Sequence, residues 1–191
     1  DDVKLEKFIA KIDTFMDKKK NLSQKLVIFT ECIATQKVIV KKLQNVSEYK
    51  ILEITAANRD EMKEIIAANF DANYKEEHRN DYDIIITTDV LAEGVNLHRA
   101  NTILNYDSPW NATRLMQRLG RINRIGSNAK AIYNYNFYPS SLGDNQINLK
   151  NRTYVKLQAF HELFGEDSQI YSTDEEVRSF DKVEHDFDDD E

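Results

Sequence analysis

The sequence predicts an α/β fold in which helices cover both faces of a mostly parallel sheet. Short apolar runs rich in β-branched residues alternate some five times with stretches whose apolar residues recur at helical spacing. This alternation is typical of parallel strands joined by helical crossovers. With 191 residues, of which 41% are hydrophobic, the chain can form one domain with a sizeable core. No apolar run reaches the ~20 residues of a membrane-spanning helix, so we expect no membrane association.

Five segments are predicted strands. DIIITT at residues 83–88 is the clearest, because an uninterrupted apolar run fits a strand that is buried on both faces. KAIYNYNFY at residues 130–138 instead alternates apolar and polar residues, which places it near the edge of the sheet. In chain order, the predicted strands are residues 25–30, 50–54, 83–88, 102–105 and 130–138.

Helices are predicted between these strands and beyond them. Apolar residues recur at helical spacing from Leu5 to Met16, which predicts an amphipathic helix within residues 1–22 that packs on the domain. Asn58, with Glu61 three residues later, is an N-cap signal for a helix that reaches Phe70. The remaining predicted helices are residues 33–43, 111–126 and 152–164.

Charge is distributed unevenly along the chain. The net charge is −7, yet residues 165–191 contain twelve acidic and only two basic residues, so the preceding part is slightly basic. We divide the chain into an N-terminal helix (1–22), a sheet domain (23–140), a helical and extended appendage (141–180) and an acidic tail (181–191). The composition of the tail predicts disorder, and its charge would allow it to compete with a polyanion for a basic surface.

The single cysteine, Cys32, excludes an internal disulfide and a cysteine-based zinc site, and it favours a reducing, cytoplasmic setting. We expect Cys32 to be a small buried residue and His98 to lie at the surface. The four histidines are scattered along the chain, so we expect no metal site.

The most informative stretch is NATRLMQRLGRINRIG at residues 111–126, which has four arginines and no acidic residue. A helix here, capped by Asn111 or Ser108, would place the arginines opposite an apolar face. These guanidinium groups must meet solvent, carboxylates from other elements, or an anion. The planar guanidinium can donate two parallel hydrogen bonds to a phosphate. The four arginines are Arg114, Arg118, Arg121 and Arg124.

Residues 84–126 resemble motifs V and VI of superfamily 2 helicases. TTDVLAEGVNL at residues 87–97 is similar to motif V, and QRLGRINRIG at residues 117–126 matches the motif VI pattern QRxGRxxRxG. KLVIFTE at residues 25–31 is similar to motif IV. The spacing is most similar to the SWI/SNF-type and related bacterial translocase branch. The resemblance implies a RecA-like three-layer αβα sandwich, the second of two motor lobes that bind ATP in the cleft between them.

The resemblance also implies roles for motif VI residues. Arg121 and Arg124 would reach the γ-phosphate, and we expect Arg124 to be the arginine finger that stabilises charge in the transition state. Gln117 would lie beside the nucleotide. Arg118 could equally form a salt bridge inside the lobe, and Arg114 could be a solvated flank.

Motifs IV and V would supply the remaining contacts. Gly94 and Asn96 would approach the ribose and phosphates of the nucleotide, while Asp89 would organise the motif V loop. The hydroxyl groups of Thr30 and Thr88 would touch the nucleic-acid backbone, a kind of contact that positions a protein without reading sequence.

Half of the expected ATP site has no counterpart in this sequence. There is no G-x-x-x-x-G-K-[ST] loop and no acidic box after a strand, so ATP and Mg²⁺ would be held mainly by a first lobe of the same full-length protein. We therefore expect this chain alone to be inactive. Glu93 stands where the RNA-handling DEAD-box branch has arginine, which favours DNA over RNA as the partner.

The sequence leaves two alternatives to this function. A RecA-like lobe could serve as a non-catalytic module that binds nucleic acid or protein. A Rossmann-type nucleotide enzyme is disfavoured, because no G-x-G-x-x-G follows any predicted strand.

Overall fold

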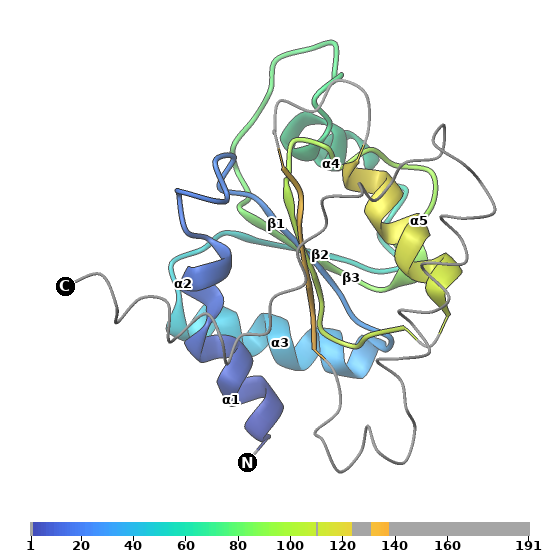
Figure 1. Cartoon of the computed structure of the whole chain (residues 1–191). Coiled ribbons are helices and arrows are strands. Elements are labelled where there is room, and N and C mark those ends of the chain that lie inside the picture. The colour runs from blue at the N-terminus through green and yellow to red at the C-terminus, as the bar shows by residue number, and fades with distance from the viewer. Residues whose placement is uncertain (1, 110, 124–130, 138–191) are drawn as a thin grey trace.

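Five parallel strands form one sheet in the computed structural model, which describes residues 2–109, 111–123 and 131–137 (Figure 1). The strand order is β2-β3-β1-β4-β5, so the predicted parallel sheet is confirmed and β5 lies at the edge as expected. Each strand falls within its predicted segment. The strands are β1 (Leu26–Phe29), β2 (Ile51–Ile54), β3 (Ile84–Thr87), β4 (Thr102–Asn105) and β5 (Tyr133–Asn136).

The strand β1 lies in the middle of the sheet, between β3 and β4. Phe29, its last residue, lies opposite Thr87 at the end of β3 and Asn105 at the end of β4. The carboxyl ends of these strands are therefore in line, and the loops that follow them emerge at one edge. Ligands of open parallel sheets bind at this edge.

Helices cover both faces of the sheet (Figure 1). Along β1, Leu26 and Ile28 pack into the core beneath α1 to α3, whereas Val27 and Phe29 pack into the core beneath α4 and α5. This confirms the predicted αβα sandwich. The helices are α1 (Val3–Ala10), α2 (Ile12–Phe15), α3 (Ile33–Val46), α4 (Lys63–Phe70) and α5 (Ala112–Ile122).

The predicted N-terminal helix is in fact two short helices that meet at Lys11. Asp2 caps the first, because its Oδ1 accepts hydrogen bonds from the backbone N–H groups of Lys4 and Leu5. At Lys11 the backbone forms a 3₁₀-type turn, because its N–H donates to the carbonyl of Phe8 three residues back. The apolar side chains on both sides of this break remain buried in one core.

The helix predicted to start at Asn58 begins only at Lys63, so that boundary was wrong. The Asn58 Oδ1 accepts from the backbone N–H of Thr55 at 2.7 Å, and its Nδ2 donates to the carbonyl of Glu53 at 3.0 Å. An Asn side chain that bonds to nearby upstream backbone in this way stabilises a turn rather than a helix.

The predictions for residues 141–191, for Arg124 and for Gly126 lie outside the described residues. In the part of the chain that the structure describes, no helix combines the length and the apolar character needed to cross a bilayer.

Lys25 is a buried lysine at the start of β1. Its side chain is 3% exposed, and its Nζ donates to the carbonyl of Tyr82 at 2.8 Å and lies 4.8 Å from the centre of the Phe70 ring. Burial, with a smaller contribution from the positive charge of Arg99, lowers the pKa of Lys25 from 10.5 to about 8.

This lowered pKa predicts a pH-dependent stability. Between the folded and unfolded pKa values the unfolded chain binds more protons, so the contribution of Lys25 to stability rises with pH. Between about pH 7.5 and about pH 10, the free energy of unfolding of the wild type should increase relative to Lys25→Met by roughly 1–2 kcal/mol. Urea unfolding measures this difference. The exposed Lys41→Met variant should show no such change, and identical pH profiles for wild type and Lys25→Met would contradict the prediction.

Candidate functional site at the carboxyl ends of the strands

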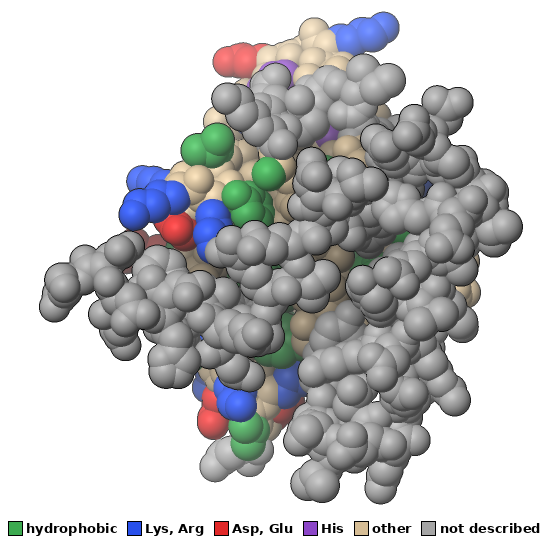
Figure 2. All heavy atoms as spheres, viewed as in Figure 1, with side chains coloured by type: hydrophobic (Ala, Val, Ile, Leu, Met, Phe, Trp, Pro, Cys, Tyr) green, Lys and Arg blue, Asp and Glu red, His purple; other side chains and the backbone are tan. Residues whose placement is uncertain are grey.

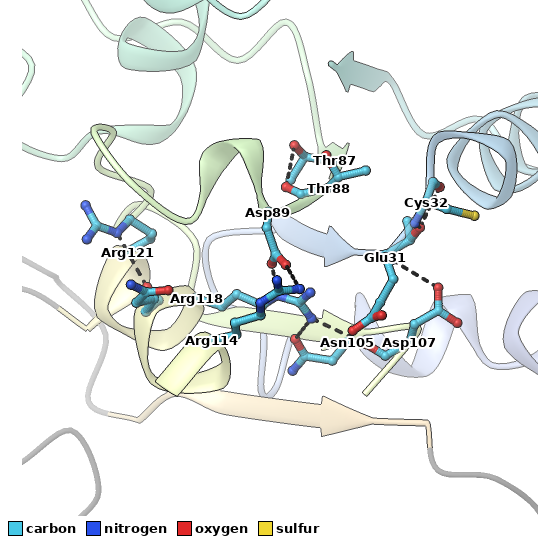
Figure 3. Close-up of polar contacts among 12 residues, drawn as sticks. Glu31, Cys32, Thr87, Thr88, Asp89, Asn105, Asp107, Arg114, Arg118 and Arg121 are labelled. Carbon is cyan, nitrogen blue, oxygen red and sulfur yellow. Dashed lines mark hydrogen bonds and ion pairs between the residues drawn. The ribbon is translucent and has the colours of Figure 1, made fainter. Parts of the chain in front are cut away.

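A fully buried arginine joins α5 to the ends of β3 and β4. The Nε of Arg118 donates to the Asp89 Oδ1 at 2.7 Å, and its Nη1 donates to the Asn105 Oδ1 at 2.9 Å and to the Asp107 carbonyl at 3.4 Å. Its guanidinium carbon lies 4.9 Å from the centre of the Phe29 ring. Figure 3 shows the Arg118 guanidinium between Asp89 and Asn105.

Asp89 accepts a second arginine as well. The Nη1 of Arg114 lies 3.2 Å from the Asp89 Oδ2, so the two carboxylate oxygens bind two different guanidinium groups (Figure 3). The salt bridge inside the lobe that was one alternative for Arg118 is confirmed, whereas Arg114 is not merely a solvated flank. Both arginines bind a carboxylate from another element, and together they fasten the start of the loop after β3 to α5.

Arg121 lies apart from Asp89. Its Nε approaches the carbonyl of Gln117 at 3.4 Å, and its Nη1 approaches the carbonyl of Val95 at 3.5 Å. Its own carbonyl accepts a hydrogen bond from the N–H of Leu97 at 2.9 Å. The half-buried Arg121 is thus held against the loop after β3, and its contact with a γ-phosphate stays a prediction.

The backbone around Gly94 is held from two sides. Gly94 has a φ of +77°, which a residue with a side chain rarely adopts, and a Cβ there would lie 2.5 Å from the Arg59 Nη2. That same nitrogen donates to the carbonyl of Glu93 at 3.0 Å. The Nε2 of Gln117 donates to the Glu93 Oε1 at 3.3 Å. Sequence reasoning missed Arg59, because no pattern connects the loop after β2 with the loop after β3.

Asn96 and His98 are directed toward Asp71, at the end of α4. The Nδ2 of Asn96 donates to the Asp71 Oδ2 at 3.0 Å, and the Nδ1 of His98 lies 3.6 Å from the Asp71 Oδ1. The surface position expected for His98 is wrong, because its side chain is buried. The predicted contacts of Gly94 and Asn96 with the ribose and phosphates stay predictions.

The loop after β1 contains Thr30 and Cys32. Thr30 is fully buried, and its hydroxyl donates to the Cys32 carbonyl at 2.9 Å and accepts from the Cys32 N–H at 3.2 Å. Cys32 is exposed, contrary to expectation, because it occupies the N-cap of α3, where its interaction with Thr35 lowers the pKa of the thiol. Thr88 is half-buried at the start of the short helix η1 (Asp89–Leu91). Nucleic-acid contacts by Thr30 and Thr88 stay predictions.

On the face of the molecule shown in Figure 2, the described charged side chains are mixed in sign. In the view of Figure 2, Lys or Arg side chains lie next to Asp or Glu side chains along the rim of the described surface. No group of three or more His, Cys, Asp or Glu side chains in the described residues could hold a metal ion.

The arrangement of buried arginine, strand-end carboxylate and adjoining loops spans the region that carries the helicase-like motifs. A family model described as the helicase conserved C-terminal domain matches residues 4–126. The chain belongs to this family. The match begins in the first turn of α1 and ends with the last residue of the motif VI pattern.

Curated relatives include helicases of several kinds. The uncharacterized ATP-dependent helicase YqhH of Bacillus subtilis is 32% identical over 170 residues, which cover 87% of this chain and 28% of the relative. The DEAD-box ATP-dependent RNA helicase 56 of Oryza sativa is 33% identical over 75 residues, covering 39% of this chain and 16% of the relative. This chain therefore spans well under half the length of these relatives.

Solved structures share the fold. The C-terminal part of the Fun30 ATPase domain aligns with a TM-score of 0.57 at 19% identity, covering 76% of this chain and 44% of that one. Dbp5 of S. cerevisiae, solved bound to RNA and ADP BeF3, aligns with a TM-score of 0.53 at 19% identity, covering 78% of this chain and 36% of that one. These similarities confirm the RecA-like fold.

Proposed function

We propose that this chain is the second motor lobe of an ATP-dependent helicase or translocase, and that it supplies arginine fingers to ATP. The observation that carries the proposal is the pair of salt bridges that Arg118 and Arg114 form with Asp89. This pair, which we call the arginine lock, fixes α5 against the end of β3. With α5 fixed, Arg121 is held against the loop after β3, where we propose that it meets the nucleotide together with Arg124. The name of the YqhH relative, an ATP-dependent helicase, supports the use of ATP.

The nucleotide would lie against the loop after β3. The Gln117 side chain reaches this loop through Glu93, and the Arg59 guanidinium lies against the backbone at Gly94, where a second cation is available to a phosphate. Arg121 and Arg124 would face the γ-phosphate, while the missing first lobe would hold most of the ATP and the Mg²⁺. The Asn96 amide now donates to Asp71, and on nucleotide binding it would donate to the ribose instead.

The nucleic acid would cross the same edge, over the loop after β1 and over Thr88. Thr30 shapes this loop through its two hydrogen bonds to Cys32. We propose DNA as the track, because Glu93 replaces the arginine of the RNA-handling branch. RNA helicases also occur among the relatives, so the test must measure ATP hydrolysis with RNA as well as with DNA.

The test uses the full-length protein that contains this chain. ATP hydrolysis is measured alone, with single-stranded DNA, with duplex DNA and with single-stranded RNA. We expect stimulation by DNA, and no hydrolysis by the isolated chain. Stimulation by RNA alone would overturn the choice of DNA. Salt-sensitive nucleic-acid binding without any ATP hydrolysis would instead favour the non-catalytic binding module.

A further inference from the structure

We infer that Lys4 and Asp107 are positioning residues through which α1 fixes the loop after β1 for nucleic-acid binding. The inference rests on the proposed function, because that function assigns nucleic-acid contact to this loop. Lys4 lies in the first turn of α1, and Asp107 lies just beyond the end of β4. Neither residue belongs to the predicted set of nucleotide or nucleic-acid ligands.

One carboxylate joins the two elements. The Asp107 Oδ1 lies 2.7 Å from the Lys4 Nζ, and the Asp107 Oδ2 accepts a hydrogen bond from the backbone N–H of Glu31 at 3.1 Å. The Lys4 and Asp107 side chains are 37% and 27% exposed, so water screens this ion pair less than it screens a fully exposed one. The carboxylate therefore bridges α1 and the loop that follows β1.

Lys4 is itself held in place. Its Nζ lies 4.1 Å from the centre of the Tyr106 ring, which is buried and packs edge-on against Phe8 at 5.5 Å. The N–H of Tyr106 donates to the carbonyl of Phe29, the last residue of β1. The ammonium group is thus fixed by an aromatic face below it and a carboxylate beside it.

Asp107 also connects to the arginine lock. Its main-chain carbonyl accepts from the Arg118 Nη1 at 3.4 Å, while its side chain holds the Glu31 backbone (Figure 3). A displacement of α1 would move the Asp107 carboxylate and, with it, the backbone of the loop after β1. The pair therefore couples α1 to the loop after β1, to which the proposed function assigns the nucleic-acid contact.

The test measures nucleic-acid-stimulated ATP hydrolysis by the full-length protein. In Lys4→Ala and Asp107→Asn, the apparent KM for DNA should rise roughly three- to tenfold, because the loop loses its tie to α1. The KM for ATP and the kcat at saturating DNA should stay unchanged. Asp107→Ala should raise the KM for DNA most, since Glu31 then loses its acceptor. The double variant Lys4→Ala/Asp107→Ala should be no worse than Asp107→Ala, because the two residues act through one interaction.

Two controls separate positioning from general destabilisation. Lys7→Ala removes an exposed lysine from the same helix and should leave the KM for DNA unchanged. Lys4→Arg keeps a positive charge beside Asp107, so its KM for DNA should stay close to the wild-type value. Stimulation of the wild type, with an unchanged KM for DNA in Lys4→Ala and Asp107→Ala, would overturn this inference alone. An equal rise in Lys7→Ala would do the same. Absence of any stimulation in the wild type would overturn the proposed function and this inference with it.

Discussion

Replacing Arg124 with alanine is expected to lower ATP turnover of the full-length protein by about 10³-fold or more, because an arginine finger stabilises charge that develops only in the transition state. Arg121→Ala should cost about 10²-fold or more for the same reason. Both effects should persist at saturating ATP and nucleic acid, since they concern the chemical step rather than binding. Steady-state hydrolysis under these conditions measures them.

Two matched variants serve as controls, one that changes the cation at position 124 and one that removes a different arginine of the same helix. Arg124→Lys keeps the charge but loses the planar fork, so it should restore little of the turnover. Arg114→Ala removes an arginine that is 54% exposed, and it should leave most of the turnover intact, because the buried Arg118 still holds Asp89 at 2.7 Å. Wild-type turnover in Arg124→Ala would contradict the finger assignment.

The sheet could be predicted from the sequence because β1 and β3 are nearly continuous apolar runs, as buried strands are, and β5 alternates as an edge strand does. The helix boundaries could not. The start of α4 depends on whether the Asn58 side chain caps a helix or bonds to upstream backbone, and both use the same residue type. The break at Lys11 likewise leaves the apolar pattern on both sides unchanged.

The candidate site shows a similar limit. Helical spacing placed Arg114 and Arg118 on the same side of α5, opposite its apolar face. Yet Arg118 is fully buried and Arg114 is half-exposed, because Asp89 binds both arginines, whereas Asn105 and the Phe29 ring cover Arg118. Burial of His98 against Asp71 depends in the same way on segments distant in sequence. A pattern within one helix cannot specify which neighbouring strands will cover it.

Arg118→Met is expected to lower the free energy of unfolding by about 3 kcal/mol, because it leaves the Asp89 carboxylate and the Asn105 amide without their buried partner. Equilibrium unfolding in urea measures the loss. The double variant Arg118→Met/Asp89→Leu should recover part of it, since removing both charges is less costly than removing one.

This expectation separates Arg118 from its neighbours in motif VI. Arg124→Ala should lose turnover at unchanged stability, whereas Arg118→Met should lose stability first, and turnover only because α5 is no longer held against the end of β3. The Arg118 side chain has no exposed surface through which to reach a ligand. Full stability of Arg118→Met combined with a loss of turnover beyond about 10²-fold would show that Arg118 acts on the nucleotide directly and that the lock is not its role.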